Sequence, residues 1–273
     1  MELALLQITI EDRREDTAAV LERFFAQDYA GEILIGLPEL FHTNYSALPD
    51  SAISQADDLL ERIRRLSEAH PSTLICGTAA LRSEHRIVNE LLIFYKGEMI
   101  PLYRKLHLFR PMGEHRLITP GTNLAVVDLP AGNTRWRIGF AICYDLRFPE
   151  IFRLLRAEGC QLVVVPAQWP ARRVDTWSLL LRARAAENQY FTAGINRVGR
   201  DGVEQFGGRS ALVDPLGRIL TDATDAPAVI RGRLDPGAVT SAREFNDSLS
   251  HRRADLYRLQ WTGTWCRVDL TTR

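Results

Sequence analysis

The chain has 273 residues, of which 46% are hydrophobic and 25% are charged. That composition is ordinary for a globular protein and excludes a disordered or fibrous chain. Its 34 Lys and Arg residues balance 34 Asp and Glu residues, so the chain lacks the broad positive field that draws nucleic acid or anionic lipid. We therefore expect neither nucleic acid nor a membrane among its partners.

The first residues and the cysteines indicate the compartment. No basic region precedes the first apolar run, which does not resemble a signal peptide, and no apolar stretch is long enough to span a bilayer. The four cysteines lie far apart, with no CxxC pair and no histidine at metal-ligand spacing. We expect a cytoplasmic protein with no metal site and no disulfide framework.

Short aliphatic runs alternate with helical patterns along most of the chain, as expected when helices cover a sheet. Apolar residues at helical spacing predict helices over 17–25, 57–69 and 176–189, and Pro149 marks the start of another helix. Several of the aliphatic runs are apolar on both faces, which predicts a buried sheet. The predicted strands are 3–10, 32–37, 73–78, 90–95, 136–142, 161–165, 191–196, 210–213 and 228–234.

No linker, repeat or low-complexity segment divides the chain, so we predict a single domain over residues 1–273. Residues 237–273 form an Arg-rich, aromatic C-terminal tail beyond the last predicted strand. Trp261 and Trp265 make this tail too apolar to float free. We expect it to pack on the domain or on a partner subunit.

Cys143 is a candidate nucleophile. It stands at the end of the apolar run 136–142 and shortly before the helix that begins at Pro149. Free backbone N–H groups and the positive end of a helix stabilise a thiolate at such a junction and can bind an oxyanion beside it. Most free cysteines are simply small buried hydrophobes, and position alone does not decide between the two interpretations.

A thiol nucleophile needs a base and a group that stabilises developing negative charge. Glu39 follows the apolar run 33–38, and Lys105 precedes the apolar Leu106. Each is interpreted as a charge at the lip of a buried strand, where α/β sheets gather their active sites. A solvated strand end remains the alternative for each.

Three segments resemble, in chain order, the signature blocks of the nitrilase superfamily of carbon–nitrogen hydrolases. They are Gly-Leu-Pro-Glu at 36–39, Tyr-Arg-Lys-Leu-His-Leu-Phe at 103–109, and Ala-Ile-Cys-Tyr-Asp-Leu-Arg-Phe-Pro-Glu at 141–150. The resemblance continues through Glu114 and later segments to about Pro236. It implies an α/β fold of the four-layer αββα sandwich type.

The resemblance also implies a Glu–Lys–Cys triad. Glu39 would take the thiol proton and later activate water, and Cys143 would attack the amide carbon. Lys105 and the backbone N–H of Tyr144 would stabilise the oxyanion. Glu114 matches the family's second glutamate, which helps position substrate and lysine; without the resemblance it reads as an exposed loop acid. No metal or organic cofactor is required, and a homodimer or a higher homo-oligomer is expected.

Two further features favour one branch of the superfamily. Tyr-Asp after Cys143 is similar to the amidases, whereas true nitrilases usually carry Trp-Glu there. The segments 168–173 and 196–202 are similar to the bacterial omega-amidases. Those enzymes hydrolyse the terminal amide of 2-oxo acids such as 2-oxoglutaramate and 2-oxosuccinamate and release ammonia, through an acyl-enzyme on the cysteine.

Such a substrate carries a carboxylate that needs a partner. Arg147 and Arg173 are the candidates, because a guanidinium can bind a carboxylate with two parallel hydrogen bonds. The alternatives are that Arg147 pins the helix start through Asp145 and that Arg173 is a surface charge. Trp169 either walls the pocket or fills the core, and together with Tyr144 we place it among the substrate-binding residues.

Other functions remain open on sequence grounds. A related amidase acting on deaminated glutathione, an N-carbamoyl compound or an aliphatic amide would share every catalytic residue. A non-catalytic scaffold would not explain why Glu39, Lys105, Glu114 and Cys143 all occur together. The Arg-rich stretches 62–65, 182–184 and 251–253 are interspersed with acids, so solvated helix faces explain them better than an acid- or nucleic-acid-binding surface.

Overall fold

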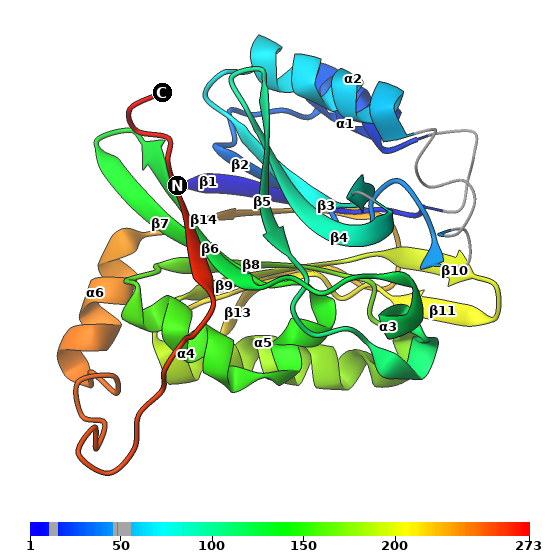
Figure 1. The fold of residues 1–273 in the computed structure, drawn as a ribbon. Coiled ribbons are helices and arrows are strands. Elements are labelled where there is room, and N and C mark those ends of the chain that lie inside the picture. Colours follow the sequence, from blue (N-terminus) through cyan, green and yellow to red (C-terminus); the bar gives the residue numbers. More distant parts are fainter. Residues whose placement is uncertain (11–15, 46–47, 49–55, 84) are drawn as a thin grey trace.

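The computed structural model describes residues 1–273 except 11–15, 46–47, 49–55 and 84. Two large sheets pack face to face, and helices cover their outer faces, so that four layers follow one another in Figure 1. The αββα sandwich predicted from the sequence is therefore confirmed.

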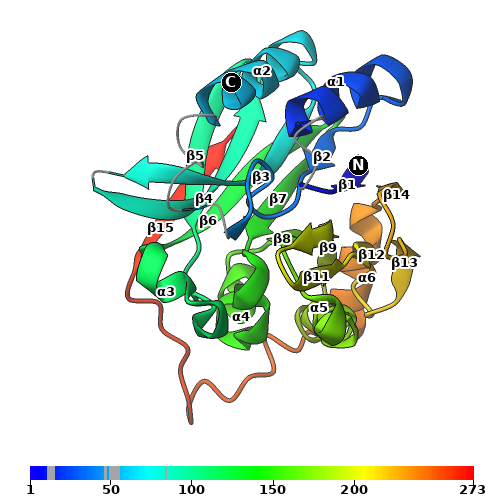
Figure 2. The ribbon, with the colours of Figure 1, turned by 90° about the vertical axis from the view of Figure 1, so that its right-hand side faces the viewer.

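The first sheet has the strand order β14-β1-β2-β3-β4-β5. The strands β1, β2 and β3 are parallel, and the remaining pairs are antiparallel. Helices α1 and α2 cover its outer face (Figures 1 and 2). The elements are β1 (Glu2–Gln7), α1 (Thr17–Gln27), β2 (Leu34–Gly36), α2 (Ala56–Ala69), β3 (Leu74–Ser83), β4 (Arg86–Tyr95), β5 (Glu98–Arg104) and β14 (Ala228–Arg233).

The second sheet has the order β13-β12-β9-β8-β7-β6-β15. Helices α4 and α5 cover its outer face (Figure 1), and a separate hairpin, β10-β11, extends beside it. The elements are α3 (Glu114–Leu117), β6 (Asn123–Ala131), β7 (Thr134–Phe140), α4 (Pro149–Ala157), β8 (Leu162–Ala167), α5 (Val174–Asn188), β9 (Phe191–Asn196), β10 (Val198–Asp201), β11 (Glu204–Gly207), β12 (Ala211–Val213), β13 (Ile219–Asp222), α6 (Pro236–Phe245) and β15 (Thr264–Asp269).

The sheets approach each other closely at Gly36, the last residue of β2. A Cβ atom at this position would come within 3.0 Å of the Ile195 side chain on β9, closer than ordinary van der Waals contact. Glycine therefore lets the end of β2 lie against the second sheet. The loops that follow β2 and β8 consequently meet, and the site described below lies there.

The tail folds back on its own domain. After α6 an extended segment leads to β15, which pairs in parallel with β6 at the edge of the second sheet. Trp261 and Trp265 pack against the main core cluster. Within the described ranges, no helix is long and apolar enough to cross a membrane.

Candidate active site

Glu39 lies in the loop after β2 and is completely buried. Its Oε1 accepts hydrogen bonds from Asn89 Nδ2 at 2.8 Å and from Lys105 Nζ at 2.8 Å. Its Oε2 accepts the backbone N–H of Gln168 at 3.0 Å. The alternative of a solvated strand end is wrong, because this carboxylate is held in a fixed orientation inside the protein.

Lys105 follows β5 and is also buried, with 1% of its side chain exposed. Its Nζ donates to Glu39 Oε1 at 2.8 Å and lies 2.9 Å from both oxygens of Glu114. Burial alone would lower the pKa of Lys105, but the charges of Glu114 and Glu39 outweigh burial and hold that pKa well above its usual range. Lys105 is therefore a permanent cation.

Glu114 opens the one-turn helix α3 and is completely buried, so the alternative of an exposed loop acid is wrong. Its Oε2 accepts the backbone N–H of Phe109 at 2.5 Å. Burial raises the pKa of Glu114, and nearby Lys105 opposes that rise. The carboxylate thus depends on the ammonium of Lys105 for its charge and holds that ammonium in place.

Tyr45 joins this charged cluster and was not among the sequence candidates. Its hydroxyl lies 2.9 Å from Glu39 Oε1, 3.0 Å from Glu114 Oε1 and 3.2 Å from Lys105 Nζ. Burial raises the pKa of Tyr45 well above its usual value, and both carboxylates raise it further. The phenol stays protonated, and its single O–H proton can be donated to either carboxylate while its oxygen accepts from the ammonium.

We expect Tyr45→Phe to lower kcat by roughly 10-fold, because one hydrogen bond to a charged group is worth about 1.5–3 kcal/mol. The loss would be milder than that caused by removing Glu39, since Lys105 still bridges the two carboxylates. Steady-state ammonia release measures the effect. Wild-type kcat in the variant would show that the hydroxyl does not support the cluster.

Cys143 opens a short 3-10 helix, Cys143–Arg147, three residues beyond the end of β7, and its backbone has a φ of 46°. A residue with a Cβ atom pays roughly 1–2 kcal/mol for this left-handed conformation. Burial raises the pKa of the Cys143 thiol well above its ordinary value, and the charge of Glu39 raises it further, against the opposing charge of Lys105. The resting thiol is therefore neutral, and it needs a base when it attacks.

Asp145 holds the turn that carries Cys143. Its fully buried carboxylate accepts the backbone N–H of Ile142 at 2.9 Å and the hydroxyl of Tyr103 at 2.7 Å. It also accepts the backbone N–H of His107 at 2.9 Å, and the ring Nδ1 of His107 lies 2.8 Å away. The segment that begins at Lys105 is thereby tied to the strained turn at Cys143. Asp145 is thus paired with these groups. The Arg147 guanidinium, which the sequence alternative paired with Asp145, lies over the Trp169 ring instead.

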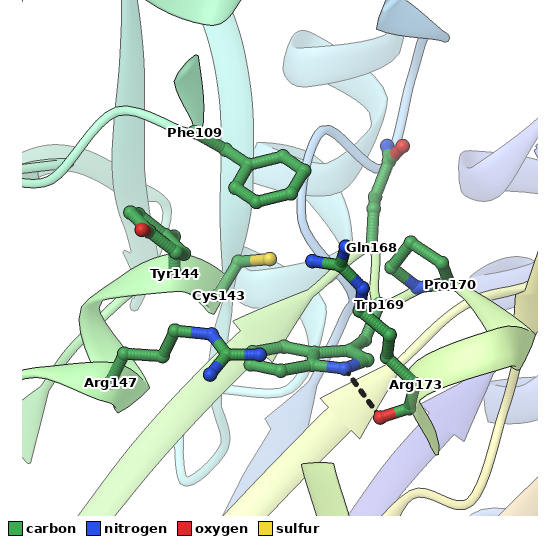
Figure 3. Close-up of a pocket in the computed structure, with 8 residues that line it drawn as sticks. All are labelled: Phe109, Cys143, Tyr144, Arg147, Gln168, Trp169, Pro170 and Arg173. Atoms are coloured by element: carbon green, nitrogen blue, oxygen red, sulfur yellow. Dashed lines mark hydrogen bonds between the residues drawn. The ribbon is translucent and has the colours of Figure 1, made fainter. Parts of the chain in front are cut away.

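A pocket of about 290 Å³ opens onto Cys143 (Figure 3). The indole of Trp169 forms one wall, the Arg147 guanidinium lies 5.3 Å from the centre of that ring, and the indole N–H donates to the Arg173 carbonyl at 2.8 Å. Figure 3 shows the Arg173 side chain directed into the pocket, which Cys143 also lines. The lining residues are Phe109, Cys143, Tyr144, Arg147, Gln168, Trp169, Pro170 and Arg173.

The structure thus brings every predicted site residue to one place: the charged cluster lies behind the thiol, and the predicted substrate-binding residues line the pocket before it. Among the residues that the structure describes, no group of His, Cys, Asp or Glu side chains is placed to hold a metal ion. A buried base, a thiol and a fixed ammonium suit acyl transfer from an amide to sulfur and then to water.

Comparison with known proteins identifies the class. The sequence matches the family model of carbon–nitrogen hydrolases over residues 2–244. The chain therefore belongs to the carbon–nitrogen hydrolase family and has the fold of the nitrilase superfamily. It is a hydrolase of carbon–nitrogen bonds and an amidase.

Two named relatives and one solved structure show how similar the chain is to other members of the family. The chain is 31% identical over 239 residues to a 2-oxoglutaramate amidase of Bacillus subtilis, covering 86% of this chain and 91% of that protein. It is 35% identical over 232 residues to omega-amidase YafV of Escherichia coli K12, covering 84% and 87%. The crystal structure of XC1258 from Xanthomonas campestris, a CN-hydrolase superfamily protein with an arsenic adduct in its active site, superposes with a TM-score of 0.82 at 28% identity and covers 92% of this chain and 97% of that one.

Proposed function

We propose that the protein is an omega-amidase that hydrolyses the terminal amide of a short 2-oxo acid, such as 2-oxoglutaramate or 2-oxosuccinamate, to the dicarboxylate and ammonia. One observation carries the proposal: two arginines, Arg147 and Arg173, line a small pocket on Cys143. The small size of the pocket suits a short substrate, and a guanidinium suits its free carboxylate. The names of the two relatives described above support the same substrate class.

In the first half of the reaction the thiol attacks the amide carbon. As the C–S bond forms, the thiol proton moves to Glu39 and negative charge develops on the carbonyl oxygen. Protonation neutralises Glu39 and weakens its hold on Lys105, whose ammonium is then available to the oxyanion together with the Tyr144 backbone N–H. The C–N bond breaks, Glu39 returns the proton to the leaving nitrogen, and ammonia departs from a thioester on Cys143.

In the second half water attacks the thioester carbon. Glu39 is again a carboxylate and takes a proton from this water, and the same donors stabilise the second oxyanion. The C–S bond breaks, the sulfur regains a proton from Glu39, and the new carboxylic acid loses its proton to water as the dicarboxylate leaves. One base thus serves both halves, which fits its fixed position beside the thiol.

We expect Arg173→Ala to raise KM for 2-oxo acid amides at least about 10-fold, because a charge-assisted hydrogen bond to a carboxylate is worth roughly 1.5–3 kcal/mol. Neutral amides of equal length should change little. The measurement compares kcat/KM for both substrate classes in wild type and variant. An equal loss for both classes would contradict the carboxylate-binding role.

Arg172→Ala is the matched control. Arg172 is the neighbouring exposed arginine, but it pairs with Glu204 at 2.7 Å and does not line the pocket. Its removal should leave the selectivity between the two substrate classes unchanged. A selectivity change as large as that of Arg173→Ala would indicate a general effect of surface charge.

The direct test of the substrate class is ammonia release from a panel of compounds. The panel contains 2-oxoglutaramate, 2-oxosuccinamate, glutamine, a simple aliphatic amide, an N-carbamoyl amino acid, deaminated glutathione and a nitrile. The proposal requires the highest kcat/KM for the 2-oxo acid amides. A preference for another amide would keep the thiol chemistry and replace the substrate class.

The oligomeric state is a separate matter, and the expected homodimer or higher homo-oligomer stays a prediction.

A further inference from the structure

A buried arginine lies behind the catalytic cluster and has no part in the reaction described above. Arg197 follows β9 directly and is the second residue of the segment 196–202, which resembles the omega-amidases. Its side chain is completely buried. A guanidinium removed from water in this way is stable only where polar or aromatic partners replace its hydration.

Two of these partners come from the two loops that meet at Glu39. Arg197 Nη1 donates to Asn44 Oδ1 at 2.5 Å and to Gln168 Oε1 at 3.3 Å. Asn44 belongs to the loop after β2, and Gln168 directly follows β8. The Phe206 ring lies 4.4 Å from the guanidinium carbon and covers it on the β11 side.

Both loops place groups on the general base. The Gln168 backbone N–H donates to Glu39 Oε2 at 3.0 Å, and its side-chain Nε2 donates to the Glu39 carbonyl at 2.9 Å. Figure 3 shows the Gln168 side chain directed away from the pocket. Asn44 immediately precedes Tyr45, whose hydroxyl contacts Glu39, as described above.

The residue before Arg197 supports the same loop from the side of the pocket wall. Asn196 Oδ1 accepts the backbone N–H of Trp169 at 2.6 Å, and its Nδ2 donates to the Trp169 carbonyl at 3.2 Å. The Asn196–Arg197 pair therefore fixes two successive residues after β8. Only Arg197 also reaches across to the loop after β2.

From these contacts we propose that Arg197 is a positioning residue. It holds the loop after β2, which carries Asn44 and Tyr45, against the loop after β8, which begins with Gln168. In this way it fixes the direction in which Glu39 points at the thiol. The guanidinium does not touch the thiol or the ammonium. It acts through the two neighbouring loops. This inference concerns the shared amidase chemistry and does not depend on which amide is the natural substrate.

The test compares Arg197→Met, Arg197→Lys and Asn44→Ala on whichever amide the wild type hydrolyses fastest. Rates are counted per folded molecule, with the folded fraction of each preparation taken from its circular dichroism, so that misfolded protein does not enter kcat. A misplacement of about 1 Å costs roughly 100-fold in rate. We expect Arg197→Met to lose 10- to 100-fold in kcat, with KM within about 3-fold of wild type. The kcat of Arg197→Lys should lie between those of wild type and Arg197→Met.

The double variant Arg197→Met/Asn44→Ala distinguishes a shared link from two independent effects. Both residues form one contact, so the double variant should be no slower than Arg197→Met alone. Losses that multiply, or a wild-type kcat in Arg197→Met, would overturn the proposal. If Arg197→Met does not fold, Arg197→Lys and Asn44→Ala decide by the same split between kcat and KM.

Arg156→Met is the matched control, because Arg156 is another buried arginine but lies on α4 and pairs with Asp247 at 2.9 Å. It should keep the wild-type kcat per folded molecule even if its melting temperature falls. An equal loss of kcat in Arg156→Met and Arg197→Met would contradict the positioning role. A wild type that hydrolyses no amide of the panel would instead contradict the proposed function.

Discussion

Cys143→Ala should abolish turnover, with a loss of at least about 10⁴-fold in kcat, because no other group at the site can form the thioester. The other three cysteines do not line the pocket, and Cys76 and Cys160 are completely buried. Ammonia release by the purified variant measures the effect. Retained turnover would contradict the assignment of the nucleophile.

The fold should survive this change. Alanine has a Cβ atom, as cysteine does, so the strain at φ 46° is the same in both proteins. The variant loses only one sulfur atom at the wall of the pocket, and we expect its free energy of unfolding to remain within about 1 kcal/mol of wild type. Denaturant unfolding of both proteins checks this. If the variant unfolds much more easily than wild type, misfolding would explain its loss of turnover.

Glu39→Gln should lower kcat by roughly 10³-fold, since general base catalysis contributes about 10²–10⁴-fold. The amide oxygen can replace Oε1 as the acceptor for Lys105 and Asn89, and Lys105 keeps both oxygens of Glu114. The variant loses the base and, at the position of Oε2, the acceptor for the Gln168 N–H. Both halves of the reaction should slow, because the same carboxylate serves each of them.

Glu150→Gln provides the control for the removal of one negative charge. Glu150 is exposed on the first turn of α4, so its neutralisation should change kcat less than about 2-fold, as expected for an exposed position. Steady-state kinetics of the two variants at the same pH make the comparison. A Glu39→Gln variant as active as Glu150→Gln would exclude Glu39 as the base.

Much of the site could be predicted because each member of the triad sits next to an apolar run. Glu39, Lys105 and Cys143 are each read from such a position and from a signature block. Tyr45 and Asn44 have no such signal, since they lie in a loop and reach the site only when the two sheets pack together. The segment around Arg197 was singled out, but its buried contact with Asn44 joins residues 153 positions apart, which no local pattern reports.

The strands that escaped prediction carry polar residues within their runs. β6 contains Asp128, whose carboxylate is bound by Arg137 on the neighbouring β7 at 2.9 Å, so the buried charge is satisfied only after the strands pair. β5 contains Pro101, which weakens its strand pattern. The first strand ends at Gln7 rather than at residue 10. The Gln7 amide donates to the carbonyls of Thr224 and Ala226, and these contacts are distant in sequence.

The most direct test of the account is to trap the acyl-enzyme. The protein is mixed with 2-oxoglutaramate, quenched in acid during turnover, digested with protease and examined by mass spectrometry. The account predicts that the peptide containing Cys143 gains the mass of the substrate less ammonia, and that Cys143→Ala shows no such adduct. Turnover of the amide with no adduct on Cys143, or with an adduct on another residue, would contradict it.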